Sequence, residues 1–306
     1  MRVFIEFMPC LGDFVTELPV LHALHERIRP LAVEVSVDRP SAGLLEDYDW
    51  IDRIHVRSGR WESRVSPITS SLDRPFDLLL WLRSNPAIKL TRMFVHARRK
   101  LGAEAYDDAA SAQGVVSHRY SVLRPILGDD LPEIETRVVL KPERARDALA
   151  AVGLPDGARI LCLGPGAGTP RRMWAVERFA ELARGLRAEF DGVVVLGAPS
   201  EASRCDALAA RAGAVSLTGR PLCLVAALLA RSSLYVGNDS GLSHLAAAQG
   251  CPAVSIGLAD PYYTPWRGYG VPGALGDLRP PDVLAFLHER ELVPGASTPV
   301  MATPPA

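Results

Sequence analysis

Three short segments of the chain carry residue types that bind or transfer charged groups. The strongest spans residues 236–242 (Val-Gly-Asn-Asp-Ser-Gly-Leu). Here an apolar run ends, polar residues form an expected turn, and a helical pattern begins at Gly241. Asp239 and Ser240 are residue types that favour the helix N-cap. The amides of Ser240, Gly241 and Leu242 would then point outward from a helix N-terminus, which suits a phosphate. Turn chemistry by itself favours a capped turn without a ligand.

A glycine-rich segment lies in a similar setting at residues 164–174 (Gly-Pro-Gly-Ala-Gly-Thr-Pro-Arg-Arg-Met-Trp). Gly166 and Gly168 would let a ligand approach the backbone closely, and Thr169 and Arg172 follow them. The two arginines of this segment could clamp a diphosphate. The segment is not a dinucleotide fingerprint, because proline and arginine interrupt it, and it lacks the Gly-Lys-Ser/Thr of a Walker loop. For either arginine alone, a solvated surface position is the alternative.

The third segment, Leu11-Gly12-Asp13, places a carboxylate directly after the first expected strand and its loop. Open α/β sheets bind their ligands at the carboxyl ends of the strands, so Asp13 is a candidate for chemistry there. Taken alone, Asp13 is better explained as the N-cap of the following helix.

Other polar residues are weaker candidates. The segment Asp47-Tyr48-Asp49 matches a metal-binding carboxylate pattern, but its place between an apolar helix and a strand favours a solvated turn. His244 lies within an apolar helix and is expected to be a satisfied core histidine. The basic stretch 92–100 is expected to form a solvated helix face, with binding of an anionic acceptor as the alternative. Surface positions are expected for three further histidines: His22, His25 and His55.

Two series of alternating strands and helices must position these segments. In the first series, strands are expected at residues 2–7, 31–37, 51–56 and 76–82. In the second series, strands are expected at 160–163, 193–196, 215–218, 234–237 and 253–256, and helices at 174–190, 201–212, 222–230 and 242–249. A proline-rich region at 131–157, with a helix at 143–152, separates the two series. Such alternation predicts an α/β fold of two doubly wound, Rossmann-like domains with right-handed crossovers.

The length of 306 residues suits two domains. We predict an N-terminal domain at 1–155, a C-terminal domain at 156–292 and a disordered tail at 293–306, which is rich in Pro, Ala, Ser and Thr. A hydrophobic fraction of 48% and a charged fraction of 23% are typical of a soluble globular protein. The net charge of −1 gives no reason to expect a nucleic-acid partner.

The five cysteines are scattered and odd in number, and no pair has metal-ligand spacing. Free, mostly buried thiols in a reducing compartment are therefore expected. No secretory signal opens the chain, and no apolar stretch approaches the roughly 18 residues of a membrane span. The sequence predicts a cytoplasmic protein without a transmembrane segment, and leaves open only peripheral contact with a membrane.

Taken together and in order, four blocks resemble glycosyltransferase family 9, the heptosyltransferases. The opening strand, Leu11-Gly12-Asp13 and residues 19–24 (Pro-Val-Leu-His-Ala-Leu) resemble the family's first strand, catalytic turn and first helix. Residues 164–182 resemble its nucleotide-diphosphate loop and helix. Residues 194–201 resemble the strand and acidic turn at its nucleoside, and residues 238–246 resemble its signature.

The resemblance implies a GT-B fold, in which two Rossmann-like domains face each other across a cleft. It implies an inverting sugar transfer, usually from ADP-heptose, without a metal or another cofactor. Asp13 would be the catalytic base, with Gly12 on the acceptor side, and Asp239 would suit sugar hydroxyls because it repels phosphate. Arg172 would stand where the family usually has a phosphate-binding lysine, and Glu201 would approach the ribose. The implied donor-binding residues are Gly166, Gly168, Thr169, Arg172, Glu201, Asp239, Ser240, Gly241, Leu242 and His244.

One segment departs from the family pattern. Residues 7–10 (Phe-Met-Pro-Cys) stand where the family commonly has a basic residue and then serines, in a stretch that lines the cleft floor near the acceptor. The acceptor is therefore expected to be either a lipopolysaccharide core or a less charged, small natural product. Two alternatives stand beside heptose transfer: a GT-B transferase with a different nucleotide-sugar donor, and a non-catalytic family member that binds a nucleotide.

Overall fold

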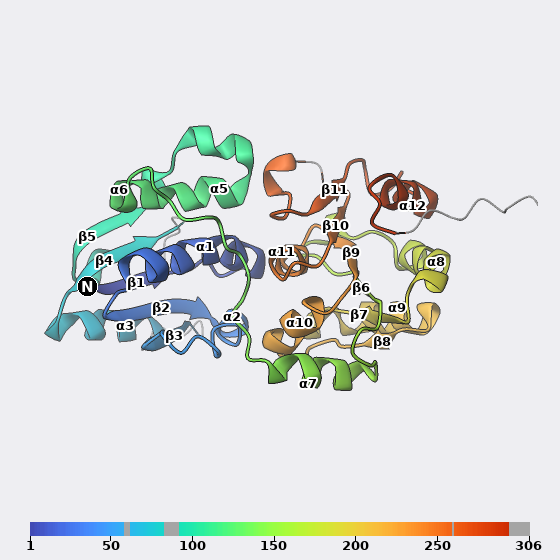
Figure 1. The fold of residues 1–306 in the computed structure, drawn as a ribbon, viewed down its shortest axis with the longest axis horizontal. Helices are drawn as coiled ribbons and strands as arrows, with labels where there is room; N and C mark the ends of the chain where they lie inside the picture. Colours follow the sequence, from blue (N-terminus) through green and yellow to red (C-terminus); the bar gives the residue numbers. More distant parts are fainter. Residues whose placement is uncertain (58–61, 83–91, 259, 294–306) are drawn as a thin grey trace, which may run out of the picture.

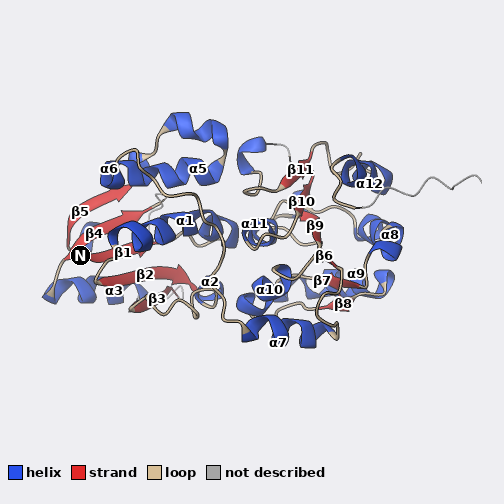
Figure 2. Cartoon of the chain, viewed as in Figure 1, coloured by secondary structure: helices blue, strands red, loops and turns tan. Residues whose placement is uncertain are grey.

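The computed structural model describes residues 1–57, 62–82, 92–258 and 260–293. The chain forms two parallel sheets, each flanked by helices (Figure 1, Figure 2). We call the first sheet with its helices the first lobe and the second sheet with its helices the second lobe. Val293, the first residue of the tail predicted to be disordered, is buried, and residues 294–306 lie outside the described part of the chain.

The first lobe contains five parallel strands in the order β3-β2-β1-β4-β5. They are β1 (Arg2–Glu6), β2 (Ala32–Asp38), β3 (Arg53–Arg57), β4 (Phe76–Trp81) and β5 (Ala97–Gly102). Successive side chains of a strand point to opposite faces. Val3 and Ile5 accordingly share a core cluster with helix α1 (Leu11–Ile28), whereas Phe4 packs in a smaller cluster with Ile68 of α3 (Glu62–Asp73). The shorter helices of this lobe are α2 (Arg39–Ala42), α5 (Val115–Tyr120) and α6 (Arg124–Leu127).

The second lobe contains six parallel strands in the order β11-β10-β9-β6-β7-β8. They are β6 (Ile160–Gly164), β7 (Gly192–Val195), β8 (Val215–Ser216), β9 (Leu234–Asn238), β10 (Ala253–Ile256) and β11 (Tyr269–Val271). Leu161 and Leu163 cluster with residues of α8 (Val176–Gly185), α9 (Ala202–Ala212) and α12 (Pro280–Glu289). Ile160 and Cys162 cluster with residues of α10 (Leu222–Leu229) and α11 (Gly241–Ala248). Both sheets are thus covered on two faces, and the predicted fold class is confirmed.

The two lobes share a hydrophobic contact between α1 and α11, which lie beside each other where the sheets meet (Figure 1). Leu21 of α1 and Leu245 of α11 belong to one continuous cluster of buried residues. This contact fixes the first turn of α1 relative to the first turn of α11.

The connection between the lobes is anchored at both ends. Tyr120 donates its hydroxyl hydrogen to the backbone oxygen of Pro132 at 2.9 Å, and the Val139 amide donates to the Tyr48 hydroxyl at 3.2 Å, which ties the segment to the first lobe. Helix α7 (Glu143–Val152) packs against α10 of the second lobe. The predicted domain boundary at residue 155 would assign this helix to the first lobe.

Several elements differ from the sequence-based expectation. The helix face expected at 92–100 is wrong for most of that stretch: residues 92–94 are helical, but Ala97–Gly102 form β5 at the edge of the first sheet. Arg98 and Arg99 are exposed there, and charged side chains on an edge strand discourage pairing with other chains. The helix expected at 174–190 is shorter, since α8 ends at Gly185 and a separate turn follows at Arg187–Glu189. The elements not predicted include β5, β11, α3, α5 and α12.

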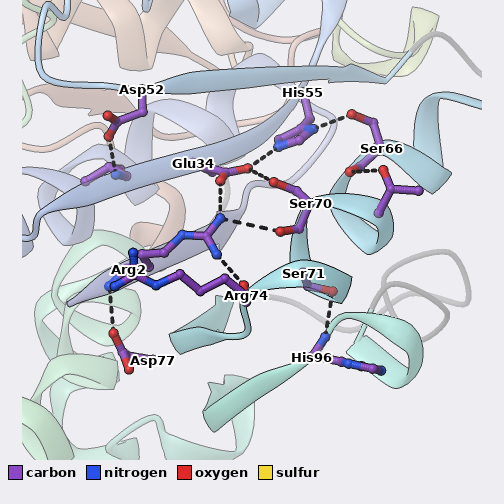
Figure 3. A network of polar contacts seen from close by, with 12 residues as sticks. Arg2, Glu34, Asp52, His55, Ser66, Ser70, Ser71, Arg74, Asp77 and His96 are labelled. Atoms are coloured by element: carbon purple, nitrogen blue, oxygen red, sulfur yellow. Dashed lines mark hydrogen bonds and ion pairs between the residues drawn. The ribbon is translucent and has the colours of Figure 1, made fainter.

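His55, expected at the surface, is buried on β3 in a polar network (Figure 3). Its Nε2 lies 2.8 Å from Glu34 Oε2 and its Nδ1 lies 2.8 Å from Ser66 Oγ. Arg2 donates to Glu34 Oε1 at 2.7 Å. Burial opposes the charge of Glu34, but hydrogen bonds from His55, Ser70 and Arg2 outweigh it and lower the pKa of Glu34 to about 2. The network joins β1, β2 and β3 to α3.

Asp47, expected in a solvated turn, is also buried. Its Oδ2 accepts a hydrogen bond of 3.1 Å from Arg144 Nε of α7, and this contact, the largest influence, lowers the pKa of Asp47. Asp47 therefore serves the junction between the lobes. His22 and His25, expected at the surface, are half-buried.

All five cysteines are free thiols, of which Cys10 is exposed and the other four are buried. Across the described ranges, no helix is long and apolar enough to cross a membrane.

Candidate active site

Asp13 occupies the first turn of α1 and is not its N-cap. Cys10 holds the N-cap position with extended backbone angles, and its side chain makes no capping hydrogen bond. Asp13 is the third residue of the helix, where a negative charge is stabilised by the helix dipole. Phe7 and Met8, which connect β1 to this turn, are buried, whereas Pro9 and Cys10 are exposed. The N-cap interpretation of Asp13 is therefore wrong.

The first turns of α1 and α11 touch each other through two glycines. A β-carbon added at Gly241 would lie 2.8 Å from the backbone nitrogen of Gly12 and 2.8 Å from Cβ of Leu11. A β-carbon added at Gly12 would lie 3.3 Å from Cα of Gly241. Both positions have ordinary backbone angles, so close approach, and not conformation, requires glycine here. The two helix N-termini, each with its free amides, converge on one place between the lobes.

The N-terminus of α11 begins as the sequence predicted. Ser240 is the N-cap with extended backbone angles, and Gly241 and Leu242 are the first helical residues. The Ser240 side chain makes no capping hydrogen bond. Its backbone oxygen accepts from the Ser243 amide at 3.1 Å, which leaves the amides of Ser240, Gly241 and Leu242 outside the helical ladder. Such amides can bind an anion.

Arg119 of α5 holds the carboxylate of Asp13. Its Nη2 donates to Asp13 Oδ1, and its Nη1 donates to the Asp13 backbone oxygen at 2.9 Å and to Thr16 Oγ1 at 2.6 Å. The same Nη1 lies 3.3 Å from Oε1 of Glu17. Burial disfavours the charge of Arg119, but Glu17 and Asp13 outweigh this effect and raise the pKa of Arg119. Neither Arg119 nor Glu17 is among the site residues expected from the sequence, although a glutamate within the apolar positions of the first helix is a usable signal.

Glu17 is fully buried one helical turn after Asp13. Its Oε2 accepts a hydrogen bond of 2.9 Å from the Met8 amide, in the loop that follows β1. Burial raises the pKa of Glu17 to about 7, against the opposing influence of Arg119. A buried carboxyl group with a pKa of about 7 thus lies one helical turn from Asp13.

His244 lies at the contact between the lobes. Its Cδ2 would be 3.1 Å from a β-carbon added at Gly12. Its Nδ1 is buried and has no hydrogen-bond partner among the described residues. Burial, with Arg119 as a second influence, lowers the pKa of His244 to about 4, so the imidazole is neutral at neutral pH. The expectation of a satisfied core histidine is wrong, and its role in donor binding stays a prediction.

Asn238, the last residue of β9, fastens the glycine-rich loop. Its Nδ2 donates to the backbone oxygen of Pro165 at 2.6 Å, and its Oδ1 accepts from the Trp174 amide at 2.9 Å. Asn238 and Trp174 are both fully buried. The two ends of the loop are therefore held at the carboxyl end of β9, while Gly168 and Thr169 are exposed at its tip. The sequence predicts Asn238 in a turn, and this function of its side chain is not apparent from the sequence.

Internal side chains explain two glycines of this segment, of which Gly166 was expected to serve a ligand. A β-carbon at Gly166 would lie 2.0 Å from Oε1 of Glu201, and one at Gly164 would lie 2.0 Å from the Tyr235 hydroxyl. Glu201 itself is half-buried and accepts a hydrogen bond of 2.8 Å from the Ala198 amide. Gly168 has open space around the position of a β-carbon, so its lack of a side chain leaves room for another molecule.

Arg172 and Asp239 form an ion pair beside the N-terminus of α11. Arg172 Nη1 lies 3.2 Å from Asp239 Oδ2, with side-chain exposures of 63% and 23%. Burial raises the pKa of Asp239, and Arg172 acts in the opposite direction. The pair brings the glycine-rich loop and the turn after β9 together, and the strands before these two segments, β6 and β9, are paired neighbours in the sheet. Over the residues for which side chains are described, no three His, Cys, Asp or Glu side chains gather as a metal site would require.

Known proteins share this architecture. The family model of glycosyltransferase family 9 (heptosyltransferase) matches residues 94–271. Lipopolysaccharide heptosyltransferase 3 of Escherichia coli is 26% identical over 302 aligned positions, and the match covers 88% of this chain and 87% of that protein.

Two solved structures have the same fold at low sequence identity. The family 9 glycosyltransferase of Veillonella parvula superposes with a TM-score of 0.79 at 19% identity, and covers 95% of this chain and 97% of its own. The E. coli heptosyltransferase WaaC with ADP superposes with a TM-score of 0.75 at 21% identity, and covers 95% of this chain and 98% of its own. The chain thus has the GT-B fold and belongs to glycosyltransferase family 9, the heptosyltransferases.

Proposed function

We propose that the chain transfers a heptose, or a related sugar, from a nucleoside diphosphate donor to an acceptor hydroxyl. ADP-heptose is the proposed donor, and the transfer inverts the anomeric centre without a metal or other cofactor. The contact of Gly12 with Gly241 carries the proposal. It brings the helix turn that carries Asp13 in one lobe close to the free amides at the N-terminus of α11 in the other.

The second lobe would hold the donor. The amides of Ser240, Gly241 and Leu242 would face the diphosphate, because free amides and the helix dipole both favour a negative charge. Gly168 and Thr169 at the exposed loop tip would lie against the same group, with Arg172 beside them. For Asp239, hydrogen bonds donated by sugar hydroxyls to its carboxylate are favoured over contact with phosphate, since two anions repel. For Glu201, contact with the ribose agrees with its half-buried place after β7.

The reaction would proceed as a single displacement. Asp13 accepts the proton of the acceptor hydroxyl as that oxygen attacks the anomeric carbon. The bond from this carbon to the donor phosphate oxygen breaks, and the nucleoside diphosphate leaves with the electron pair. The amides of α11 and the guanidinium of Arg172 would meet the charge that develops on the leaving group. His244 would contribute as a neutral imidazole, given its low pKa.

The acceptor would enter beside the loop between β1 and α1. The exposed residues of this loop, Pro9 and Cys10, carry no charge, which favours a weakly charged acceptor such as a small natural product. The relationship to lipopolysaccharide heptosyltransferase 3 favours a lipopolysaccharide core. Both acceptor classes belong in the first activity screen.

A panel of nucleotide sugars tests the proposal. The unfolding midpoint should rise with ADP-heptose, because a ligand that binds only the folded state stabilises it. Incubation with both acceptor classes should then yield a product whose anomeric configuration, read by NMR, is opposite to that of the donor. A rise with a different nucleotide sugar alone would identify another donor. Binding without transfer to any acceptor would indicate a non-catalytic family member.

A further inference from the structure

Two carboxylates of α1 compete for one guanidinium. Asp13 and Glu17 are four residues apart and therefore lie on the same face of the helix. Arg119 reaches Asp13 with Nη2 and Glu17 with Nη1. The side chains of Asp13, Glu17 and Arg119 are 20%, 0% and 6% exposed, so solvent screens the two pairs only weakly.

The Glu17 charge is not needed to anchor the loop after β1. Glu17 accepts a single amide hydrogen bond there, from Met8, and a neutral carbonyl oxygen of the same shape could accept it equally well. Burying an ionisable group is unfavourable unless it is paired. The contact in which its charge matters most is the one with Arg119.

We propose that Glu17 is a positioning residue for sugar transfer, which shares Arg119 with Asp13 and so keeps the Asp13 carboxylate a competent proton acceptor. The inference rests on the proposed role of Asp13 as the base. An arginine beside a lone carboxylate stabilises its charged form, which weakens it as a base. A second carboxylate on the same arginine divides that stabilisation and repels the charge of the first.

The other charged or titratable groups around this cluster are few among the described residues. Arg57 of β3 acts on Glu17 from one side and lies 3.9 Å from Glu6 of β1. Tyr106, which precedes α5, faces Glu17 and Arg119. His244 of α11 faces Arg119 and Asp13.

With a pKa of about 7, Glu17 would be ionised above neutral pH and protonated below it. Above pH 7 it would share Arg119, and below pH 7 it would leave Arg119 to Asp13. The turnover number of the wild-type protein should therefore rise in a step around pH 7, on top of any titration of Asp13 itself.

Glu17→Gln removes the charge and keeps the shape. We expect a variant that folds and whose turnover number lacks the step near pH 7. Above about pH 7.5 its turnover should fall about two- to tenfold below the wild type, and below about pH 6 the two should be similar. The KM for the donor should stay within about twofold, because the donor lies on the other lobe.

Glu34→Gln is the matched control, since it removes another buried carboxylate of the first lobe that the cluster does not contact. This control should keep the step even if it is less stable. A step retained by Glu17→Gln overturns the inference. So does a loss by the same factor at every pH, which a merely structural role would give.

A second measurement needs no substrate. The free energy of unfolding is measured near neutral to mildly basic pH for Asp13→Asn, Glu17→Gln and the double variant. If the two carboxylates share Arg119, Asp13→Asn should be more destabilising in the Glu17→Gln background, because Arg119 then loses its last counter-charge. Costs that simply add would overturn the inference. A wild-type protein that transfers no sugar but shows this coupling would overturn the proposed function and leave the shared arginine established.

Discussion

Gly12 and Gly241 meet across the two lobes so closely that a β-carbon on Gly241 would lie 2.8 Å from the backbone nitrogen of Gly12. Backbone atoms cannot rotate away as a flexible side chain can. The distance between the two helix N-termini is therefore set by the absence of a single methyl group. This spacing therefore also sets the distance between the groups that a ligand would contact on the two lobes.

Gly241→Ala should push the lobes apart and reduce turnover. Inserting a methylene into packed structure typically costs about 1–3 kcal/mol, and a misplacement of about 1 Å between reacting groups can cost about 10²-fold in rate. Because such a misplacement can cost up to about 10²-fold, we expect turnover to fall by at least about tenfold. The variant should still unfold in one cooperative transition. Steady-state kinetics and thermal unfolding measure the two quantities.

Two alanine variants calibrate this result. A β-carbon at Gly12 would meet the His244 ring at 3.1 Å, and a ring can shift, so Gly12→Ala should lose less turnover. Gly276 has nothing within 4 Å, so Gly276→Ala should leave turnover and stability unchanged. Equal effects at Gly241 and Gly276 would show that the contact between the lobes does not govern the reaction.

Arg172→Ala should weaken donor binding. A hydrogen bond to a charged group is worth about 1.5–3 kcal/mol, and loss of the guanidinium would also leave Asp239 unpaired next to the diphosphate. Titration calorimetry with ADP measures the change in affinity. Arg171 is the neighbouring exposed arginine without an ion pair among the described contacts, so Arg171→Ala is the control. Similar affinities for the wild type and Arg172→Ala would exclude a diphosphate contact.

Local sequence signals were sufficient for most of the strands and for the turn after β9. The runs that form β4 and β9 are apolar on both faces, as strands in covered parallel sheets must be. The start of α11 at Gly241 follows from capping and turn chemistry within a few residues. The edge strand β5 was missed because Arg98, Arg99 and Lys100 in succession hide any alternation of apolar and polar residues.

Contacts between distant residues could not be predicted in this way. Arg119 lies 106 residues after Asp13, and no local pattern links them. Gly166 in the sequence predicts room for a ligand, whereas in the structure the Glu201 carboxylate occupies that room. A sequence shows where a glycine stands, but it does not show which neighbouring group fills the space that a β-carbon would take.

Acid should remove the stability that Glu34 contributes. Its pKa is about 2 in the folded protein and about 4.5 in the unfolded chain, so the contribution is complete above pH 4.5 and is lost as the pH falls toward 2. A shift of this size corresponds to about 3 kcal/mol. Urea unfolding of the wild type and Glu34→Gln should show a difference that is constant near neutral pH and shrinks below about pH 4.5. A difference that does not change with pH would place its origin in packing.

Removal of divalent metal ions should not reduce sugar transfer. The charge of the leaving group would be met by the free amides at the start of α11 and by Arg172, which EDTA does not affect. The assay compares initial rates with and without EDTA, and again after addition of Mg²⁺ or Mn²⁺. Activity that disappears with the chelator and returns with the metal would contradict this mechanism.

Asp13→Asn should abolish most of the turnover while the protein still folds and binds the donor. Asparagine has nearly the same shape, and its side-chain oxygen can accept the Arg119 hydrogen bond, but it cannot take up the proton of the acceptor hydroxyl. General-base catalysis by a positioned group contributes typically about 10²–10⁴-fold, so the loss should be at least about 10²-fold.

The position of Asp13 makes this variant decisive. Because Cys10 and not Asp13 is the N-cap, loss of a capping bond cannot explain a defect in Asp13→Asn. Replacement of a charge in the first helical turn should cost only about 0.3–1 kcal/mol from the helix dipole, beyond the weakened pair with Arg119. Calorimetry with the nucleotide sugar should give a donor affinity close to that of the wild type, since the donor contacts proposed above lie on the second lobe. If the variant turns over at a near-normal rate with the true acceptor, the base must be another residue.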